Sequence, residues 1–363
     1  MHGMTRSIRS IARLLAGLAL ASLAGATPAA DTPPPLPALG ASLAQLTVSG
    51  VSSGGYMAVQ FQVAHSALVT GAGILAAGPY ECATGSMWRA LNNCMNPGTG
   101  AHTPGAEQTL ARVREEADAG SIDPPAGLRD DRVWVFSGGA DRTVERPVVD
   151  ALLDFYRRVL PGDAVRFVEV GEAGHAMMSV ADPQPNACAT SEPPFINRCG
   201  DLDAAGELLA HLIGPLAPRS TPPAGELLAF DQRPFTGAAP IELSLADRGY
   251  AYVPTACREG GCRVHVAFHG CRQGEAQVGR RFVEGAGYNE WADSNRLIVL
   301  YPQVRPRSGF AWGSLRWVYN PKGCWDWWGY ADPDYATRNG GQIRAVRAML
   351  ERLVAPLPPR PER

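Results

Sequence analysis

From Gln45 onward, hydrophobic residues alternate between short strand-like runs and longer helical ones. Runs of β-branched and aromatic residues predict strands, and apolar residues recurring every three or four positions predict helices. Alternating strands and helices predict an α/β fold whose mostly parallel central sheet is covered on both faces. The expected strands are 46–48, 72–77, 133–136, 165–170, 250–253, 263–268 and 297–301, and the expected helices are 54–65, 107–119, 148–160, 202–213, 283–294 and 342–354.

The first thirty residues, 1–30, have the pattern of a signal peptide. Three arginines precede an apolar run at 14–23, which ends in small residues. This pattern predicts cleavage after Ala26, with a site near Ala30 as the alternative. The run is shorter than the about 20 residues of a membrane helix, and no later segment is long and apolar enough to span a bilayer. We therefore expect a secreted or periplasmic protein without stable membrane insertion, an uncleaved amphipathic anchor being the alternative.

Residues 31–363 suffice for one large α/β domain. A proline-rich connection at 215–225 separates two halves, about 40–214 and 226–356. The chain carries 33 basic and 35 acidic residues and no basic run, so no nucleic-acid partner is expected.

Eight cysteines in a chain with an export signal predict disulfides. Zinc is the alternative, but no C-x2-C pair occurs and the histidines lack ligand spacing, so no metal is predicted. Sequence alone leaves the connectivity open. Close spacing favours the pairs Cys82–Cys94, Cys188–Cys199 and Cys257–Cys262, which leaves Cys271 for Cys324.

A candidate nucleophile lies between the first predicted strand and helix. Gly50-Val51-Ser52-Ser53-Gly54 matches G-x-S-x-G, the nucleophile turn of α/β hydrolases. The glycines permit the tight turn that pushes the Ser52 hydroxyl out of the sheet, and the Ser53 N–H would face a developing oxyanion. The alternative is a plain serine–glycine turn.

A serine nucleophile needs a histidine base oriented by a carboxylate. In α/β hydrolases the acid and the histidine follow successive strands after the serine. Asp141 follows the predicted strand 133–136, and His175 follows the strand 165–170. Asp141 could instead be a helix N-cap, and His175 a surface loop residue. Glu145 and Asp150 are competing acids farther from the strand end. His65 and His211 fall within predicted helices and are expected to be helix-surface or packing residues.

The order of the segments predicts a circular permutation. Only about twenty residues of the mature chain precede Ser52, whereas an α/β hydrolase normally places several strands there. The strand 263–268 followed by His269-Gly270-Cys271 has the pattern of the missing oxyanion strand and turn. The Cys271 N–H would then be the second oxyanion donor. A plain turn after a strand is the alternative.

These motifs together resemble the circularly permuted polyhydroxybutyrate depolymerases, which are secreted esterases. The resemblance rests on segments 48–57, 78–82, 269–273 and 320–330, and on Asp141 and His175. It implies hydrolysis of poly(3-hydroxybutyrate) or its oligomers through an acyl-enzyme, with Ser52, Asp141 and His175 as the triad and Ser53 and Cys271 as oxyanion donors. It also implies a monomer without a cofactor.

By the same resemblance, Trp328 would line the substrate crevice, although Trp325 and Trp327 are close by. No separate polymer-binding domain is expected, so adsorption would come from the domain's own aromatic residues, some of which pack in the core. That cluster comprises Trp312, Trp317, Trp325, Trp327, Trp328 and Tyr330. Two alternatives remain: a broad short-chain or aromatic-acid esterase, and a polymer-binding module on an inactive hydrolase fold.

Overall fold

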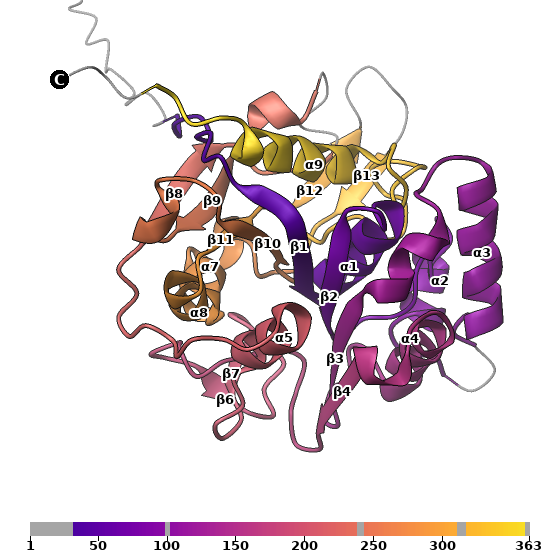
Figure 1. Ribbon diagram of the computed structural model, residues 1–363. Helices are drawn as coiled ribbons and strands as arrows, with labels where there is room; N and C mark the ends of the chain where they lie inside the picture. The colour runs from indigo at the N-terminus through magenta and orange to yellow at the C-terminus, as the bar shows by residue number, and fades with distance from the viewer. Residues whose placement is uncertain (1–31, 99–101, 238–242, 311–316, 360–363) are drawn as a thin grey trace, which may run out of the picture. The chain divides into compact units, whose positions relative to one another are not determined.

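An eight-stranded sheet forms the centre of the computed structural model, which describes residues 32–98, 102–237, 243–310 and 317–359 (Figure 1). Its spatial order is β4-β3-β2-β1-β10-β11-β9-β8. The first six strands in that order run parallel, and β9 and β8 are added antiparallel at one edge. The strands are β1 (Ser42–Val51), β2 (Val69–Leu75), β3 (Arg132–Gly138), β4 (Val165–Val170), β8 (Glu226–Asp231), β9 (Arg248–Val253), β10 (Arg263–Phe268) and β11 (Leu297–Tyr301). The predicted mostly parallel sheet is confirmed.

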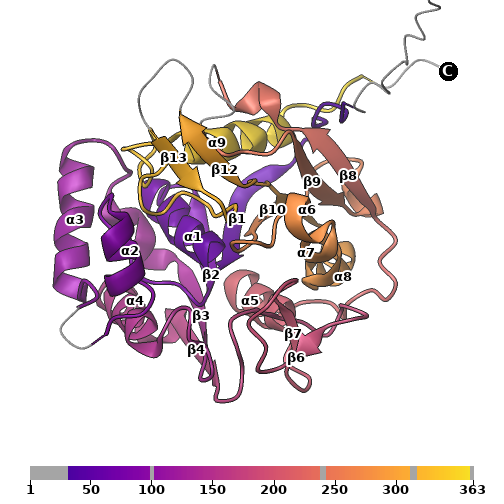
Figure 2. The same ribbon diagram turned by 180° about the vertical axis from the view of Figure 1, so that it is seen from behind.

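Helices cover both faces of the sheet, because successive side chains of a strand point to opposite sides. Along β3, Val133 and Val135 belong to a core shared with α1, α4 and α9, whereas Trp134 and Phe136 belong to one shared with α5, α7 and α8. Figure 2 shows the same two layers from behind. The helices are α1 (Ser53–Ala64), α2 (Met87–Asn93), α3 (Ala106–Asp118), α4 (Arg146–Val159), α5 (Ala204–Ile213), α6 (Glu275–Val278), α7 (Arg281–Gly285), α8 (Tyr288–Ser294) and α9 (Gly341–Val354).

Strand β10 lies beside β1 although the two are far apart in sequence. Ser49 is paired with Ala267, and Gly50 with Phe268. The carboxyl ends of parallel strands meet at one edge of a sheet, where α/β proteins bind their ligands. The loops that follow β1, β3, β4 and β10 are therefore gathered at a single edge.

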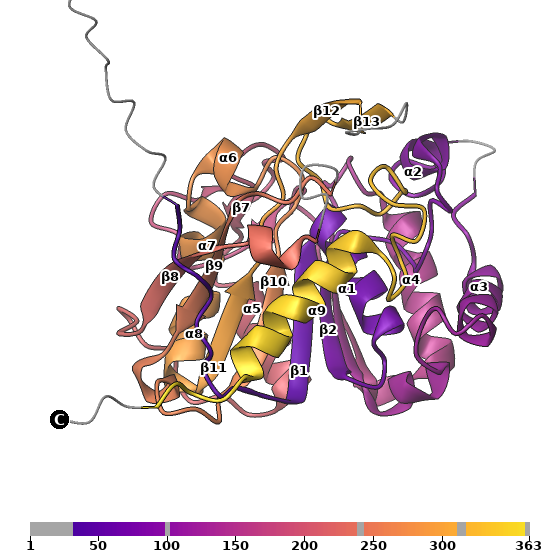
Figure 3. The same cartoon turned by 90° about the horizontal axis from the view of Figure 1, so that it is seen from above.

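Small elements project from this edge. Strands β12 (Arg307–Phe310) and β13 (Trp317–Asn320) form a hairpin on the same side of the molecule as α2 (Figure 3). A second small sheet contains β5 (Met177–Met178), β6 (Asn186–Ala187) and β7 (Ile196–Arg198).

The expected single helix over 283–294 is wrong, because two short helices, α7 and α8, occupy this region. Gly287 separates them with φ +91°, a left-handed conformation that ends one helix before the next begins. The proline-rich stretch 215–225 contains neither helix nor strand, as expected.

All four predicted disulfides are present: Cys82–Cys94, Cys188–Cys199, Cys257–Cys262 and Cys271–Cys324. No helix of the described ranges is long and apolar enough to cross a membrane. The predicted signal peptide lies outside the described residues.

Candidate active site

The turn between β1 and α1 holds Ser52 in a strained conformation. Ser52 has φ 56° and ψ −122°, which a residue with a side chain rarely adopts. A Cβ atom at Gly50 would lie 2.1 Å from the carbonyl oxygen of Gly54, and one at Gly54 would lie 2.3 Å from that of Phe268. Only glycine fits at either position, which explains why the turn requires G-x-S-x-G. Non-glycine strain of this kind is concentrated at functional sites.

Asp141 and His175 form a buried hydrogen-bonded pair. Asp141 Oδ2 lies 2.7 Å from His175 Nδ1, and both side chains are buried. The other carboxylate oxygen accepts the backbone N–H groups of Thr143 and Val144, at 2.7 and 3.0 Å. Asp141 is therefore fixed within its own loop and does not cap α4, whose N-cap is Glu145. A carboxylate at Nδ1 holds the proton there and leaves Nε2 as the basic nitrogen.

Ser52 follows β1, Asp141 follows β3 and His175 follows β4, so the three residues lie at the same edge of the sheet. Ser52 and Val144, three residues after Asp141, line a common cavity. Ser52 Oγ and His175 Nε2 are not hydrogen-bonded in the described structure. Catalytic hydrogen bonds often tighten only when substrate binds.

The turn after β10 packs directly on the nucleophile turn. A Cβ atom at Gly270 would lie 3.5 Å from Ser52 Cβ. The Gly270 N–H donates to Gln273 Oε1 at 2.7 Å, and the Arg272 N–H donates to the Lys322 carbonyl at 2.7 Å. The backbone N–H of Cys271 lies in sequence between these two N–H groups, each of which already has an acceptor. Cys271 also lines the Ser52 cavity.

His269 has a structural role in this turn. Its Nδ1 donates to the Gly270 carbonyl at 2.7 Å, and its Nε2 accepts the Val304 N–H at 3.2 Å. Burial lowers the pKa of His269 to about 4, so the ring is neutral near pH 7. The neutral ring can therefore make both bonds and hold the turn.

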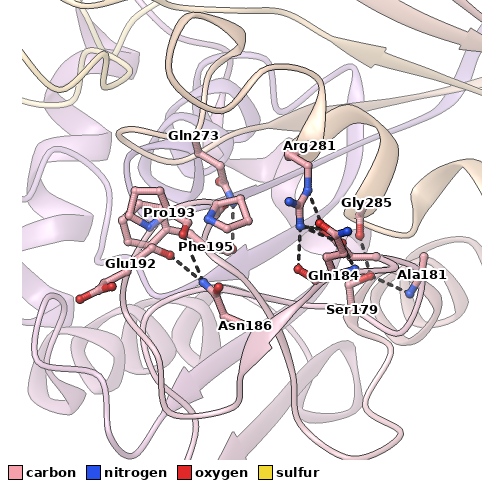
Figure 4. Close-up of polar contacts among 12 residues, drawn as sticks. Ser179, Ala181, Gln184, Asn186, Glu192, Pro193, Phe195, Gln273, Arg281 and Gly285 are labelled. Atoms are coloured by element: carbon pink, nitrogen blue, oxygen red, sulfur yellow. Dashed lines mark hydrogen bonds and ion pairs between the residues drawn. The ribbon is translucent and has the colours of Figure 1, made fainter.

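Gln273 links this turn to the loop that carries Phe195 (Figure 4). Its Nε2 donates to the carbonyls of Pro194 and Phe195 at 3.1 and 2.9 Å, while its Oε1 accepts from Gly270. The Phe195 ring meets the His175 ring edge-on at a centroid distance of 6.4 Å. Gln273 thus connects the Cys271 turn to the surroundings of His175. No role for Gln273 was predicted from the sequence, although the residue belongs to the segment 269–273 that carries the family resemblance.

An apolar cavity of about 240 Å³ opens above Ser52. Trp328 lines it and is 8% exposed, and Trp327 lines it while stacking on Tyr56 at a centroid distance of 4.1 Å. Trp325 is fully buried against Phe268 and is not part of the lining. A larger hollow of about 510 Å³ beside α3 is lined by charged residues such as Glu81 and Arg112 and by Cys82 of a predicted disulfide, but by none of the predicted catalytic or substrate-binding residues.

The mouth of the cavity carries exposed apolar side chains from α2 and the β12–β13 hairpin. Of the predicted aromatic cluster, Trp317 is exposed, Trp325, Trp327, Trp328 and Tyr330 are buried, and Trp312 lies outside the described residues. Five further exposed apolar side chains of α2 and the hairpin were not predicted from the sequence: Met87, Trp88, Leu91, Phe310 and Tyr319. Of these, Met87, Leu91 and Tyr319 line the cavity.

Three other histidines, His265, His65 and His211, do not line the Ser52 cavity. His265 bridges Thr47 and Ser49 by hydrogen bonds of 2.8 and 2.7 Å beneath the nucleophile strand, and burial lowers its pKa to about 3. His65 follows the end of α1, and His211 contacts the Ala164 carbonyl. Within the described ranges, no three histidine, cysteine or acidic residues are grouped to hold a metal ion.

Comparison with known proteins identifies relatives over most of the chain. It is 40% identical over 324 residues to the poly(3-hydroxybutyrate) depolymerase of Delftia acidovorans, covering 88% of this chain and 61% of that protein. It is 33% identical over 328 residues to the polyhydroxybutyrate depolymerase of Talaromyces funiculosus, covering 88% and 92%. The chain thus spans about three fifths of the length of the Delftia relative. No protein-family model matches the chain.

Two solved structures share the fold. The crystal structure of the PHB depolymerase from Penicillium funiculosum is 32% identical and superposes with a TM-score of 0.79, covering 89% of this chain and all of that one. A serine-to-alanine PHB depolymerase complexed with an R3HB trimer is 31% identical and has the same TM-score and coverage.

Proposed function

Because this chain belongs to the polyhydroxybutyrate depolymerase family, we propose that it is a serine esterase hydrolysing poly(3-hydroxybutyrate) or its oligomers. One observation carries the proposal: Ser52, strained at the end of β1, lies beneath an apolar cavity at the sheet edge that also holds the Asp141–His175 pair. An apolar cavity suits a methyl-bearing polyester, whose polar groups are limited to its ester links.

The reaction proceeds in two steps. His175 Nε2 takes the proton of Ser52 Oγ as that oxygen attacks the ester carbonyl, and then gives the proton to the departing alcohol. The result is a hydroxybutyryl-enzyme, which water cleaves with His175 again acting as base. Asp141 orients the imidazole and stabilises its positive charge. This mechanism requires no cofactor.

The negative charge that develops on the ester oxygen is stabilised by the N–H groups of Ser53 and Cys271. Ser53 is the first residue of α1, where the helix dipole favours negative charge. The commitment of the Gly270 and Arg272 amides to other acceptors supports Cys271 as the second donor. Removing one such donor typically costs about 100- to 1,000-fold in rate.

Residues 33–363 form one catalytic domain with permuted strand order. Two facts support this: Pro33–Arg363 cluster as one compact unit, and β10 and β11, which follow in sequence, complete the sheet beside β1. Joining the final helix to β1 would restore the usual order, and the Leu39 and Ala41 N–H groups already donate to the Leu353 carbonyl.

The enzyme works as an exported monomer that adsorbs to polymer through its own surface. Four disulfides are typical of oxidising compartments. The exposed apolar side chains of α2 and of the β12–β13 hairpin, such as Trp88 and Trp317, would lie on the polymer. Trp328 contacts the bound chain inside the cavity.

The test compares Ser52→Ala with Ser42→Ala, a matched change at the opposite end of β1. Ser52→Ala should lose hydrolysis of a polyhydroxybutyrate suspension and of p-nitrophenyl butyrate, and should resist fluorophosphonate labelling, while keeping its circular dichroism and polymer adsorption. Ser42→Ala should behave as wild type. Full activity of Ser52→Ala would refute the nucleophile, and wild type active only on the soluble ester would indicate a general esterase.

A further inference from the structure

Among the residues that the structure describes, Lys322 is the only charged one that lines the Ser52 cavity. It is also the only lysine of the chain. Its side chain is exposed and forms no ion pair or hydrogen bond with any described residue. A single uncompensated positive charge therefore lies beside an otherwise apolar cavity.

The backbone around Lys322 is held against the Cys271 turn. The Lys322 carbonyl accepts the Arg272 N–H at 2.7 Å, and the disulfide Cys271–Cys324 closes the same region two residues further on. The lysine is thus anchored next to the amide that we assign to the oxyanion, although its side chain remains free to reach a ligand.

Two other polar side chains that line the Ser52 cavity already have hydrogen-bond partners within the protein. Asn320 is committed, because its amide donates to the Cys324 carbonyl and accepts the Cys324 N–H. The Tyr56 hydroxyl donates to the Cys94 carbonyl. The Lys322 ammonium is therefore the group best suited to bind an anion near Ser52.

The chemistry of a polyester chain determines where such an anion would lie. Each chain of 3-hydroxybutyrate units has one hydroxyl end and one carboxylate end. When Ser52 attacks an ester, the Ser52 Oγ–carbon bond forms and the carbon–alkoxy bond breaks, and the departing alkoxide takes its proton from His175. The departing fragment always carries the carboxylate end, and the fragment left on Ser52 carries the hydroxyl end.

We propose that Lys322 binds the terminal carboxylate of short 3-hydroxybutyrate oligomers and thereby favours cleavage close to the carboxylate end. This inference rests on the proposed function. An ion pair of an exposed lysine is worth about two- to fivefold in an equilibrium, and salt weakens it because exposed charges are screened. The expected selectivity is therefore modest, and it should depend on ionic strength.

The experiment compares the (R)-3-hydroxybutyrate trimer as free acid with its methyl ester at pH 7.5, using kcat/KM. For wild type, the acid-to-ester ratio should be about two- to fivefold higher than for Lys322→Met. Lys322→Arg should keep most of the preference. Arg129→Met is the charge-matched control: Arg129 is exposed and precedes β3, at the opposite edge of the sheet, so the ratio should stay at the wild-type value. A second measurement needs no variant, because added NaCl should lower the ratio for the wild-type enzyme.

The outcomes separate the two proposals. Hydrolysis of both trimers with an unchanged ratio in Lys322→Met, or a wild-type ratio insensitive to salt, would overturn the role of Lys322 and leave the esterase function intact. If wild type hydrolyses the polymer suspension but neither trimer, the role of Lys322 also fails, whereas the proposed function itself fails if wild type hydrolyses neither the suspension nor the trimers.

Discussion

Removing the disulfide Cys271–Cys324 should impair both stability and catalysis, whereas removing Cys257–Cys262 should affect stability alone. The first bridge spans 53 residues and the second spans 5. In the chain-entropy description, closing these loops stabilises the fold by about 4 and about 2 kcal/mol, respectively. We therefore expect Cys271→Ala/Cys324→Ala to lose about twice as much free energy of unfolding as Cys257→Ala/Cys262→Ala.

The two variants should differ more in kcat than in free energy of unfolding. Only the first bridge fixes the turn that presents the Cys271 amide, and only this bridge lines the cavity. With the amide still present but loosely held, kcat should fall about 10- to 100-fold, less than the loss expected from removing an oxyanion donor. Cys257→Ala/Cys262→Ala is the matched control, since this bridge joins the segment between β9 and β10 at the far ends of the strands.

Urea unfolding followed by tryptophan fluorescence measures the first effect, and hydrolysis of p-nitrophenyl butyrate measures the second. Wild-type kcat in Cys271→Ala/Cys324→Ala would refute our view that the bridge holds the oxyanion donor. A larger stability loss in the control variant than in this one would refute the loop-length argument.

Two further predictions concern buried polar groups. Replacing Gln273 by methionine removes its hydrogen bonds to Gly270 and Phe195, so kcat on a soluble ester should fall about 10- to 100-fold with a smaller change in KM. Gln273→Glu, which keeps the acceptor for the Gly270 N–H, should recover part of the rate. A kcat of Gln273→Met equal to that of wild type would contradict a positioning role. Burial raises the pKa of Asp131 from 3.8 to about 7, so its stabilising contribution is complete below pH 3.8 and is lost as the pH rises through about 7. Asp131→Asn still accepts from Gln62 but does not titrate. It should therefore lose less unfolding free energy between pH 4 and pH 8 than wild type, by about 4 kcal/mol; identical pH profiles would contradict this.

The sequence predicts best those strands whose own residues favour extended structure. The predicted bounds of β4, β10 and β11 agree with the structure, because each is a short run rich in β-branched or aromatic residues between polar turns. Strand β8 was missed, since Leu227, Leu228 and Ala229 favour helices at least as much as strands. It is a strand because it pairs with β9, a long-range interaction that local propensity cannot reveal.

The same distinction holds at the site. Ser52 was predictable because Gly50 and Gly54 are required by sterics within five residues. Beyond Cys271 and Trp328, the cavity lining was not predictable from the sequence. Leu91 and Tyr319, for example, come from distant segments without periodic patterns and meet only in the folded chain. Gln273 was missed for a similar reason: its partners lie in a loop some 80 residues earlier.

The place of β10 in the sheet has a consequence for synthesis of the protein. Strand β1 is fully buried over its second half, and one side of it is covered only by β10, which is translated more than 200 residues later. Until then the nascent chain exposes an apolar strand edge able to pair with other chains. Slow folding and a need for protection from aggregation on the way out of the ribosome are the expected result of so non-local a pairing.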